Sequence, residues 1–239
     1  MTATLTESDT TIKTAADTRT YWRVLLAVIA PLPLLGMGIG YLLNPTDGDA
    51  DVATTVAGIE AHPGRALVSM LAAVLFVMLL PPATAALAWV SRRRAPRLTT
   101  VGASLTLLGL LAGFATLPAG NNIAWIAAQE DLDLTIIQTL DDALWAQPTA
   151  GVGIILFLAA ITIGLPLLGI AMWRAKAAPR WMAVCLIAGT ATHMFTPGHV
   201  AQGVGLLVGA VGFAGVSRAL LRTRNDEFDL PPVSAARPR

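Results

Sequence analysis

The sequence predicts an all-α membrane protein, a polytopic bundle of six transmembrane helices with both the amino and the carboxyl terminus in the cytoplasm. Three observations support this fold class. Of the 239 residues, 55% are hydrophobic and only 13% are charged, which is more apolar than a soluble domain. The apolar residues gather in six long runs. All Lys and Arg residues except Arg65 lie in or beside segments on one side of these runs, and such a bias marks the cytoplasmic side.

The first predicted helix covers residues 22–43 and follows a polar tail, residues 1–20, for which we expect disorder. The apolar run is too long for a signal peptide and lacks a small-residue cleavage site, so we expect it to remain as an anchor. It contains Pro31 and Pro33 and ends at Asn44. The whole domain is predicted to extend over residues 21–222.

An acidic segment, residues 44–64, is expected outside the membrane. Asp47, Asp49 and Asp51 alternate there as in the opening of an EF-hand calcium loop. The sixth and twelfth positions are Val52 and Gly58, where an EF hand needs Gly and a bidentate Glu. We therefore predict a solvated acidic loop with at most a weak attraction for cations.

The second and third predicted helices, residues 66–90 and 98–117, are joined by the loop Ser91 to Arg97, which carries four arginines. This loop fixes the orientation of the chain, because so many arginines favour the cytoplasmic side. Pro81 and Pro82 interrupt the second helix and predict a bend.

A long outer connection, residues 121–147, contains leucine and isoleucine residues at every fourth position: Leu132, Ile136, Leu140 and Leu144. This spacing predicts an amphipathic surface helix over about residues 132–145, with Trp125 and Trp145 at the depth of the lipid headgroups. A connector packed on the surface is the favoured interpretation, and a lid over a mouth between helices is the alternative.

The last three predicted helices cover residues 151–173, 181–196 and 200–221, and a tail over residues 223–239 is expected to be disordered. Pro166 predicts a kink in the first of them. The second has only 16 residues, or ~24 Å of helix, which is shorter than a hydrocarbon core of ~30 Å. Its outer end is therefore expected at or just below the headgroups.

The three histidines all map to outer helix ends under this topology, which makes them the sharpest functional signal. They define a predicted polar ligand pocket in an otherwise apolar bundle, made of His62, Arg65, His193, Thr196, His199 and Gln202. Arg65 could bind a phosphate headgroup or an acidic substrate there. The ordinary alternative is that Arg65 extends to the interface or pairs with a loop carboxylate such as Glu60.

His62, His193 and His199 could also ligate zinc or a haem iron, because imidazole is the commonest metal ligand. However, His193 and His199 are six residues apart, which matches no helical metal-hydrolase motif, and no carboxylate lies within a turn of either. Histidines that bond to loop carbonyls at the membrane interface are the ordinary case. We therefore predict no cofactor and keep zinc or haem as an alternative.

The order of these features resembles a family of six-helix integral membrane proteins found in actinobacteria. The matching elements are the His62-Pro63-x-Arg65 entry, the Arg92 to Arg97 loop, the Trp173 to Trp181 loop and a Pro-Gly turn before the last helix. The resemblance covers most of residues 21–222. It implies a multi-pass protein of the inner cell membrane and no particular chemistry.

The sequence favours a non-catalytic role as an accessory or interaction subunit, because it carries no catalytic set of residues. The expected partners are membrane lipids and another membrane protein or a second copy, bound through glycine-rich faces such as Gly205 and Gly209. Nucleic acid is not expected, because the basic residues flank membrane segments. Proton-coupled transport is disfavoured, since four of the apolar runs contain no Asp, Glu, Lys or Arg. Lipid or small-molecule binding in the outer pocket and a metal or haem enzyme are the two alternatives.

Overall fold

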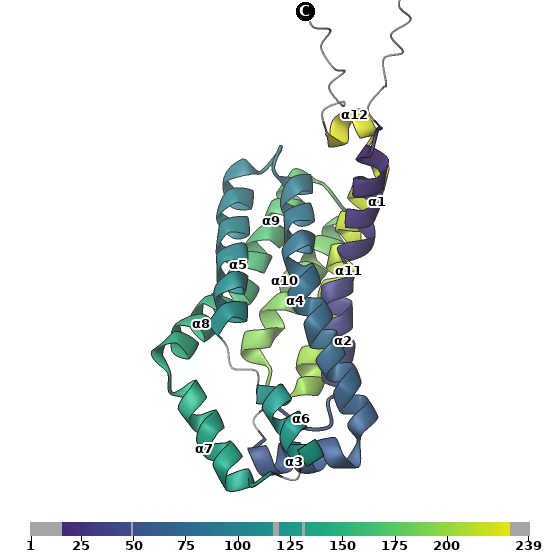
Figure 1. Cartoon of the computed structure of the whole chain (residues 1–239). Coiled ribbons are helices and arrows are strands. Elements are labelled where there is room, and N and C mark those ends of the chain that lie inside the picture. Colours follow the sequence, from purple (N-terminus) through teal and green to yellow (C-terminus); the bar gives the residue numbers. More distant parts are fainter. Residues whose placement is uncertain (1–15, 49, 117–119, 131, 230–239) are drawn as a thin grey trace, which may run out of the picture.

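A computed structural model describes residues 16–48, 50–116, 120–130 and 132–229 of the chain (Figure 1). The regular elements of these residues are all helical. They are α1 (Arg19–Ile29), α2 (Leu32–Leu43), α3 (Val52–Ala61), α4 (Pro63–Ser91), α5 (Pro96–Thr116), α6 (Gly120–Glu130), α7 (Leu134–Trp145), α8 (Pro148–Ala159), a π-helical turn (Ala160–Gly164), α9 (Leu165–Ala175), α10 (Arg180–Phe195), α11 (His199–Arg222) and α12 (Asn225–Phe228). The all-α prediction is confirmed for this part of the chain. The predicted disorder of residues 1–15 and 230–239 falls outside the described residues.

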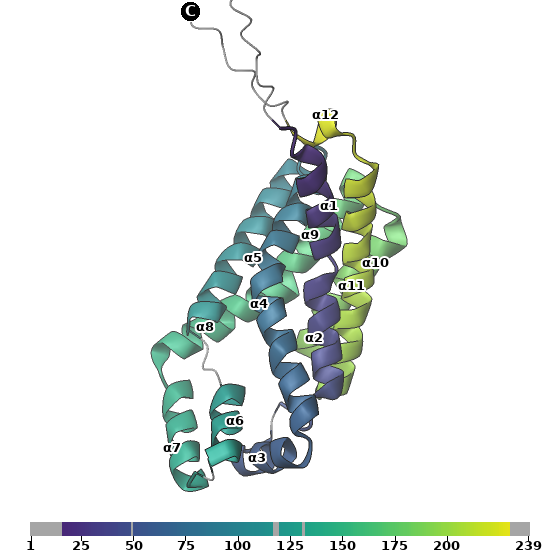
Figure 2. The ribbon, with the colours of Figure 1, turned by 45° about the vertical axis from the view of Figure 1, so that its right-hand side comes forward.

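The helices form a long bundle with a smaller group of helices at one end (Figures 1 and 2). The bundle contains α1, α2, α4, α5 and α8 to α11. We call the group made of α3, α6 and α7 the cap, and its small apolar core is separate from that of the bundle. The arginine-rich loop after α4 and the loop after α9, which carries Lys176, lie at the opposite end, which we call the basic end, together with both described ends of the chain.

Among the residues that the structure describes, five helical stretches are long and apolar enough to cross a membrane: Arg19–Leu43, Pro63–Ser91, Pro96–Thr116, Pro148–Ala175 and His199–Arg222. Large apolar side chains stay exposed along them, for example Met78 at 66%, Leu108 at 67% and Ile155 at 67%. Helices that are apolar on their outer faces as well as their inner faces are typical of proteins surrounded by lipid. The sixth predicted span corresponds to α10, whose 16 residues make it shorter than the other five.

Prolines interrupt the first stretch but not the second. Pro31 has no N–H with which to bond the Ala27 carbonyl, and α1 ends just before it. The Ser217 hydroxyl of α11 donates to that carbonyl instead (2.6 Å), so the break is stabilised by tertiary contact. By contrast, α4 continues as one helix through Pro81 and Pro82, where the sequence predicted a bend.

The kink predicted near Pro166 corresponds to the π-helical turn that separates α8 from α9. Pro166 cannot donate to the Thr162 carbonyl, four residues before it, and a locally widened turn is one way in which a helix accommodates a missing donor. Gly164 in this turn lies against Thr106 of α5. A methyl group added to Gly164 would overlap the Thr106 hydroxyl, so this crossing needs a glycine.

The glycine-rich faces are used inside the chain. Gly205 and Gly209 of α11 lie against Gly189 of α10, and Gly38 of α2 lies against Gly203 of α11. A Cβ on Gly38 would come within 3.0 Å of the Gly203 carbonyl oxygen. These close backbone contacts bring α2, α10 and α11 together. The glycines in these faces that we expected to bind a partner are therefore already covered by neighbouring helices.

The two described ends of the chain are tied together at the basic end. The Arg19 guanidinium donates to the Asn225 carbonyl (3.3 Å) and binds the Asp17 carboxylate (2.9 Å), and the hydrogen bonds from Arg19 lower the pKa of Asp17 to about 2. Phe228 of α12 is buried against Trp89, with ring centroids 4.9 Å apart. Within the segment from residue 223 for which we expected disorder, residues 225–228 form the helix α12, and this tertiary contact holds it against α4.

Candidate functional site

Two aspartate side chains act as N-terminal capping residues for helices α3 and α7 of the cap. The Asp51 carboxylate accepts a hydrogen bond from the Thr54 amide (2.7 Å) and starts α3, and Asp133 accepts one from the Thr135 amide (2.8 Å) and starts α7. Hydrogen bonds from Thr54 also hold the pKa of Asp51 below its usual range. The segment expected as a solvated acidic loop therefore contains a helix. Ile137 of α7 is buried in the apolar core of the cap.

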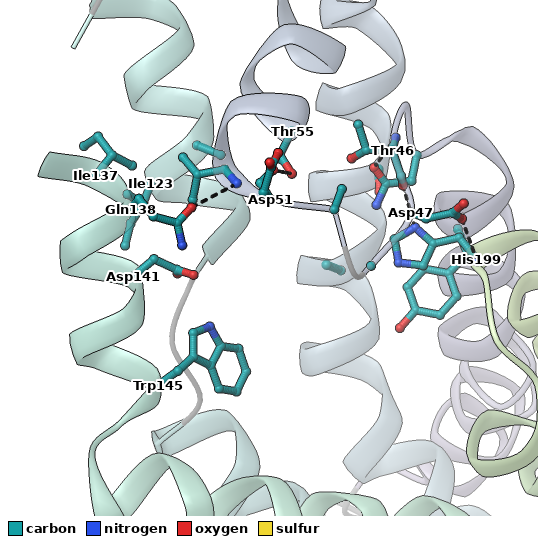
Figure 3. A pocket seen from close by; sticks show the side chains of 18 of the residues that line it. Thr46, Asp47, Asp51, Thr55, Ile123, Ile137, Gln138, Asp141, Trp145 and His199 are labelled. Carbon is teal, nitrogen blue, oxygen red and sulfur yellow. Dashed lines mark hydrogen bonds between the residues drawn. The ribbon is translucent and has the colours of Figure 1, made fainter. Parts of the chain in front are cut away.

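A pocket of about 350 Å³ lies between the cap and the bundle (Figure 3). Its walls come from α2, α3, α4, α6, α7, the segment between α2 and α3, and the start of α11. The lining includes three carboxylates, those of Asp47, Asp51 and Asp141, and neutral hydrogen-bonding side chains such as those of Tyr41 and Gln138. No Lys or Arg is among the lining residues, so the pocket favours positive charge.

His199 forms one wall of the pocket, where two contacts orient its ring and a third holds its backbone. Its Nδ1 lies 2.8 Å from the Thr46 carbonyl oxygen, its ring stacks on Tyr41 with centroids 4.7 Å apart, and its backbone amide donates to Asp47 (3.1 Å). Because a carbonyl oxygen only accepts, Nδ1 must carry the proton. Its Nε2 faces Gly48, where a Cβ would come within 2.8 Å. A metal at His199 would have to use this obstructed nitrogen.

Helix α7 forms the opposite wall. Gln138, Asp141 and Trp145 are spaced three and four residues apart, which puts them on one helical face, and Figure 3 shows Asp141 and Trp145 on the pocket side. Gln138 accepts from the Val52 amide (3.4 Å) and donates to the Asp142 carboxylate (2.9 Å), which links α7 to α3. Within the described chain Asp141 forms no hydrogen bond or ion pair. Its carboxylate is therefore available to a ligand.

Among the predicted ligand residues whose side chains are described, His199 alone lines this pocket. His62 lies exposed between α3 and α4, and Arg65 is exposed and donates to the Leu43 carbonyl (3.2 Å). Thr196 and Gln202 are brought together, because Gln202 donates to the Thr196 carbonyl (3.2 Å). The side chain of His193 is outside the described part of the structure. Among the side chains that are described, no group of three or more His, Cys, Asp or Glu is arranged to hold a metal.

Sequence reasoning missed most of the pocket, including Tyr41, Asp47, Gln138, Asp141 and Trp145. One signal was present: the polar positions of α7 repeat with helical spacing on the face next to its apolar residues. The other wall could not be found in this way, because Tyr41 and His199 are brought together only when α2 packs on α11.

Comparisons with known proteins give no information on the function of this chain. No protein-family model matches the sequence, and no curated protein and no solved structure is significantly similar to it.

Proposed function

We propose that this chain is a non-catalytic, six-helix protein of the inner cell membrane that binds a small, positively charged molecule in the pocket under its cap. The pocket is the observation that carries the proposal: three carboxylates line a volume of about 350 Å³ with no basic side chain among them. This volume is at the small end of the range for ligand pockets, ~300–1,000 Å³, so it suits a small amine.

The two walls offer complementary contacts to such an amine. Asp141 supplies a carboxylate without a partner in the described chain, and Trp145, one turn later on α7, supplies an aromatic face. Ammonium groups bind favourably to both. On the opposite wall, Asp47 is already bonded to the His199 amide, so it contributes charge more than a free acceptor.

The position of the chain ends supports six membrane crossings. Arg19 contacts Asn225, so α1 begins at the end of the bundle where the chain leaves α11. A chain that returns to its starting side must cross an even number of times. The five long stretches therefore need α10 as a sixth, and its 16 residues reach ~24 Å. The basic residues in and beside the loops at this end favour a cytoplasmic location for both termini.

Thermal unfolding of the detergent-solubilised protein tests the amine site with matched pairs of probes. Choline and putrescine should raise the unfolding temperature, whereas their uncharged counterparts, dimethylbutanol and butanediol, should not. Asp141→Asn should weaken amine binding roughly tenfold, since a charge-assisted contact is lost. Glu60→Gln is the matched control, because Glu60 is an exposed cap carboxylate outside the pocket lining. Equal responses to charged and uncharged probes, or unchanged binding in Asp141→Asn, would contradict the proposal.

An accessory role is the second candidate, and one observation favours it. Ile136 and Leu140 of α7 are 65% and 47% exposed on the cap, beyond the end of the bundle. Native mass spectrometry of protein extracted gently from its own membranes separates the two candidates. The chain with a small basic molecule supports the ligand site, whereas a fixed ratio to one other polypeptide supports the accessory role.

A further inference from the structure

A second pocket, of about 310 Å³, lies at the basic end of the bundle, far from the cap. We call it the basic pocket. Four cationic side chains from three separate segments line it: Arg93 and Arg94 after α4, Lys176 after α9 and Arg222 at the end of α11. Trp89 and Glu227 also line this pocket.

The positive charge of these four side chains is not neutralised by any carboxylate of the described chain. Arg94 donates to the Ala175 carbonyl (3.3 Å), and Arg93 donates to the Glu227 carbonyl (2.9 Å). Both acceptors are neutral backbone oxygens. The ion pairs of the described chain are Arg19 with Asp17 and Arg224 with Asp226, so none of the four cations is paired with a carboxylate there. Glu227 is the only acidic residue in the lining, and the pocket therefore carries a net positive charge.

The backbone bonds also fix where the cations lie. Arg94 links the loop after α4 to the end of α9, and Arg93 links the same loop to α12. Lys176 ends α9 with φ of +53°, a left-handed conformation that Gly or Asn adopts more easily. Phe228 packs on Trp89 and holds α12 as one side of the pocket. Positively charged side chains from segments distant in sequence therefore lie close together in the basic pocket.

The general bias for basic residues on the cytoplasmic side does not account for this convergence. Arg97 and Arg180 satisfy that bias equally well, and both are exposed outside the pocket lining. A hollow lined by several guanidinium groups and an ammonium matches the oxygen atoms of a phosphate, which guanidinium binds through parallel hydrogen bonds. Basic pockets between transmembrane helices on the cytoplasmic side bind anionic lipid headgroups in this way.

We infer that the basic pocket binds a phosphate group, supplied by an anionic lipid of the adjacent leaflet or by a free phosphate compound. Arg94 and Lys176 approach it from the two loops, and Arg93 and Arg222 contribute the remaining charge. Because Trp89 lies in the wall, the pocket adjoins side chains that favour the membrane interface. This inference is independent of the amine site, which lies at the other end of the molecule.

The test uses the full chain in an uncharged detergent and two charge-matched double variants. In Arg94→Gln/Lys176→Gln both substitutions fall in the pocket, and in Arg97→Gln/Arg180→Gln both fall outside it. Phosphatidylglycerol and inorganic phosphate are the anionic probes, and phosphatidylcholine and chloride are their controls. Thermal unfolding and native mass spectrometry measure binding.

We expect phosphatidylglycerol or phosphate to bind the natural chain and the Arg97/Arg180 variant alike. Binding should fall roughly tenfold or more in the Arg94/Lys176 variant, because two charge-assisted contacts are lost. Retention of phosphatidylglycerol alone identifies a lipid headgroup, and binding of phosphate alone identifies a free compound. Equal losses in both double variants, or no preference over phosphatidylcholine and chloride, would overturn the inference. If the Arg94/Lys176 variant fails to fold, Arg222→Gln takes its place.

Discussion

Gly48 and His199 show how closely one residue can constrain a pocket wall. The His199 ring is held between Tyr41 and the Thr46 carbonyl, and its Nε2 points at Gly48. There is no room for a side chain at Gly48 while the ring stays where it is. The shape of this wall therefore depends on a glycine that forms no side-chain contact of its own.

Gly48→Ala should displace the His199 ring, because the new Cβ would come within 2.8 Å of Nε2. Loss of the bond to Thr46 should cost about 1 kcal/mol, seen as a lower temperature of thermal unfolding. Gly64→Ala is the matched control, since a Cβ at Gly64 meets no atom within 4 Å. This control should be neutral or slightly stabilising in a helix. If the two variants unfold at the same temperature, the ring is not held as described.

The short helices show which parts of the fold sequence patterns can reveal. The long apolar runs predicted all the helices of the bundle, because burial in lipid imposes length and composition on them. Helix α3 escaped prediction since its ten residues include Gly58 and two β-branched threonines, and only the capping residue Asp51 marks its start. Helix α12 is a single turn held by the packing of Phe228 on Trp89, which no local pattern encodes.

The hydrogen bond by which Asp51 caps the start of α3 should weaken in acid. The hydrogen bonds from Thr54 place the pKa of the folded Asp51 carboxyl below its usual value of 3.8. A depressed pKa means that the carboxylate stabilises α3 fully above this usual value, and that the contribution is lost as the pH falls through the lower folded-state pKa. Limited proteolysis near Val52 should therefore accelerate below about pH 4.

Asp51→Asn is the variant that isolates this effect. Asparagine can also cap a helix, but it does not titrate, so this part of the acid sensitivity should disappear while α3 stays protected at neutral pH. Asp51→Ala should expose α3 at every pH. An acid response that is unchanged in Asp51→Asn would assign the loosening to another group.

At the scale of the whole molecule, the all-α architecture followed from the sequence, but the functional geometry did not. The sequence prediction centred on histidines at the outer helix ends. Of the histidine side chains that the structure describes, His199 lines the pocket and His62 does not, and His199 lies there beside Tyr41 and Asp141 from distant segments. The basic loops were recognised as topological signals. That Arg94 and Lys176 line the same hollow depends on how α4, α9 and α12 pack.

The six crossings that we propose would place the cap outside the cell and both termini inside. Single cysteines introduced at Thr18, Ala53 and Asp229 in a Cys185→Ala background test this with a membrane-impermeant maleimide. Ala53 on α3 should react in intact cells, whereas Thr18 and Asp229 should react only after lysis. A five-crossing chain would place Thr18 and Asp229 on opposite sides, and only one of them would then be protected.

The packing of α2 on α11 also determines when the bundle can close during synthesis of the chain. Gly38 meets Gly203, Ser217 satisfies the carbonyl freed by Pro31, and Arg19 reaches Asn225, so the first membrane helix finds its partners near the end of the chain. During synthesis α1 and α2 enter the lipid long before α11 leaves the ribosome. Until then their small-residue face and the Ala27 carbonyl have only lipid or transient neighbours. Closure of the bundle must therefore follow translation of its last helix, and a chain truncated before His199 would leave its first helix without this packing.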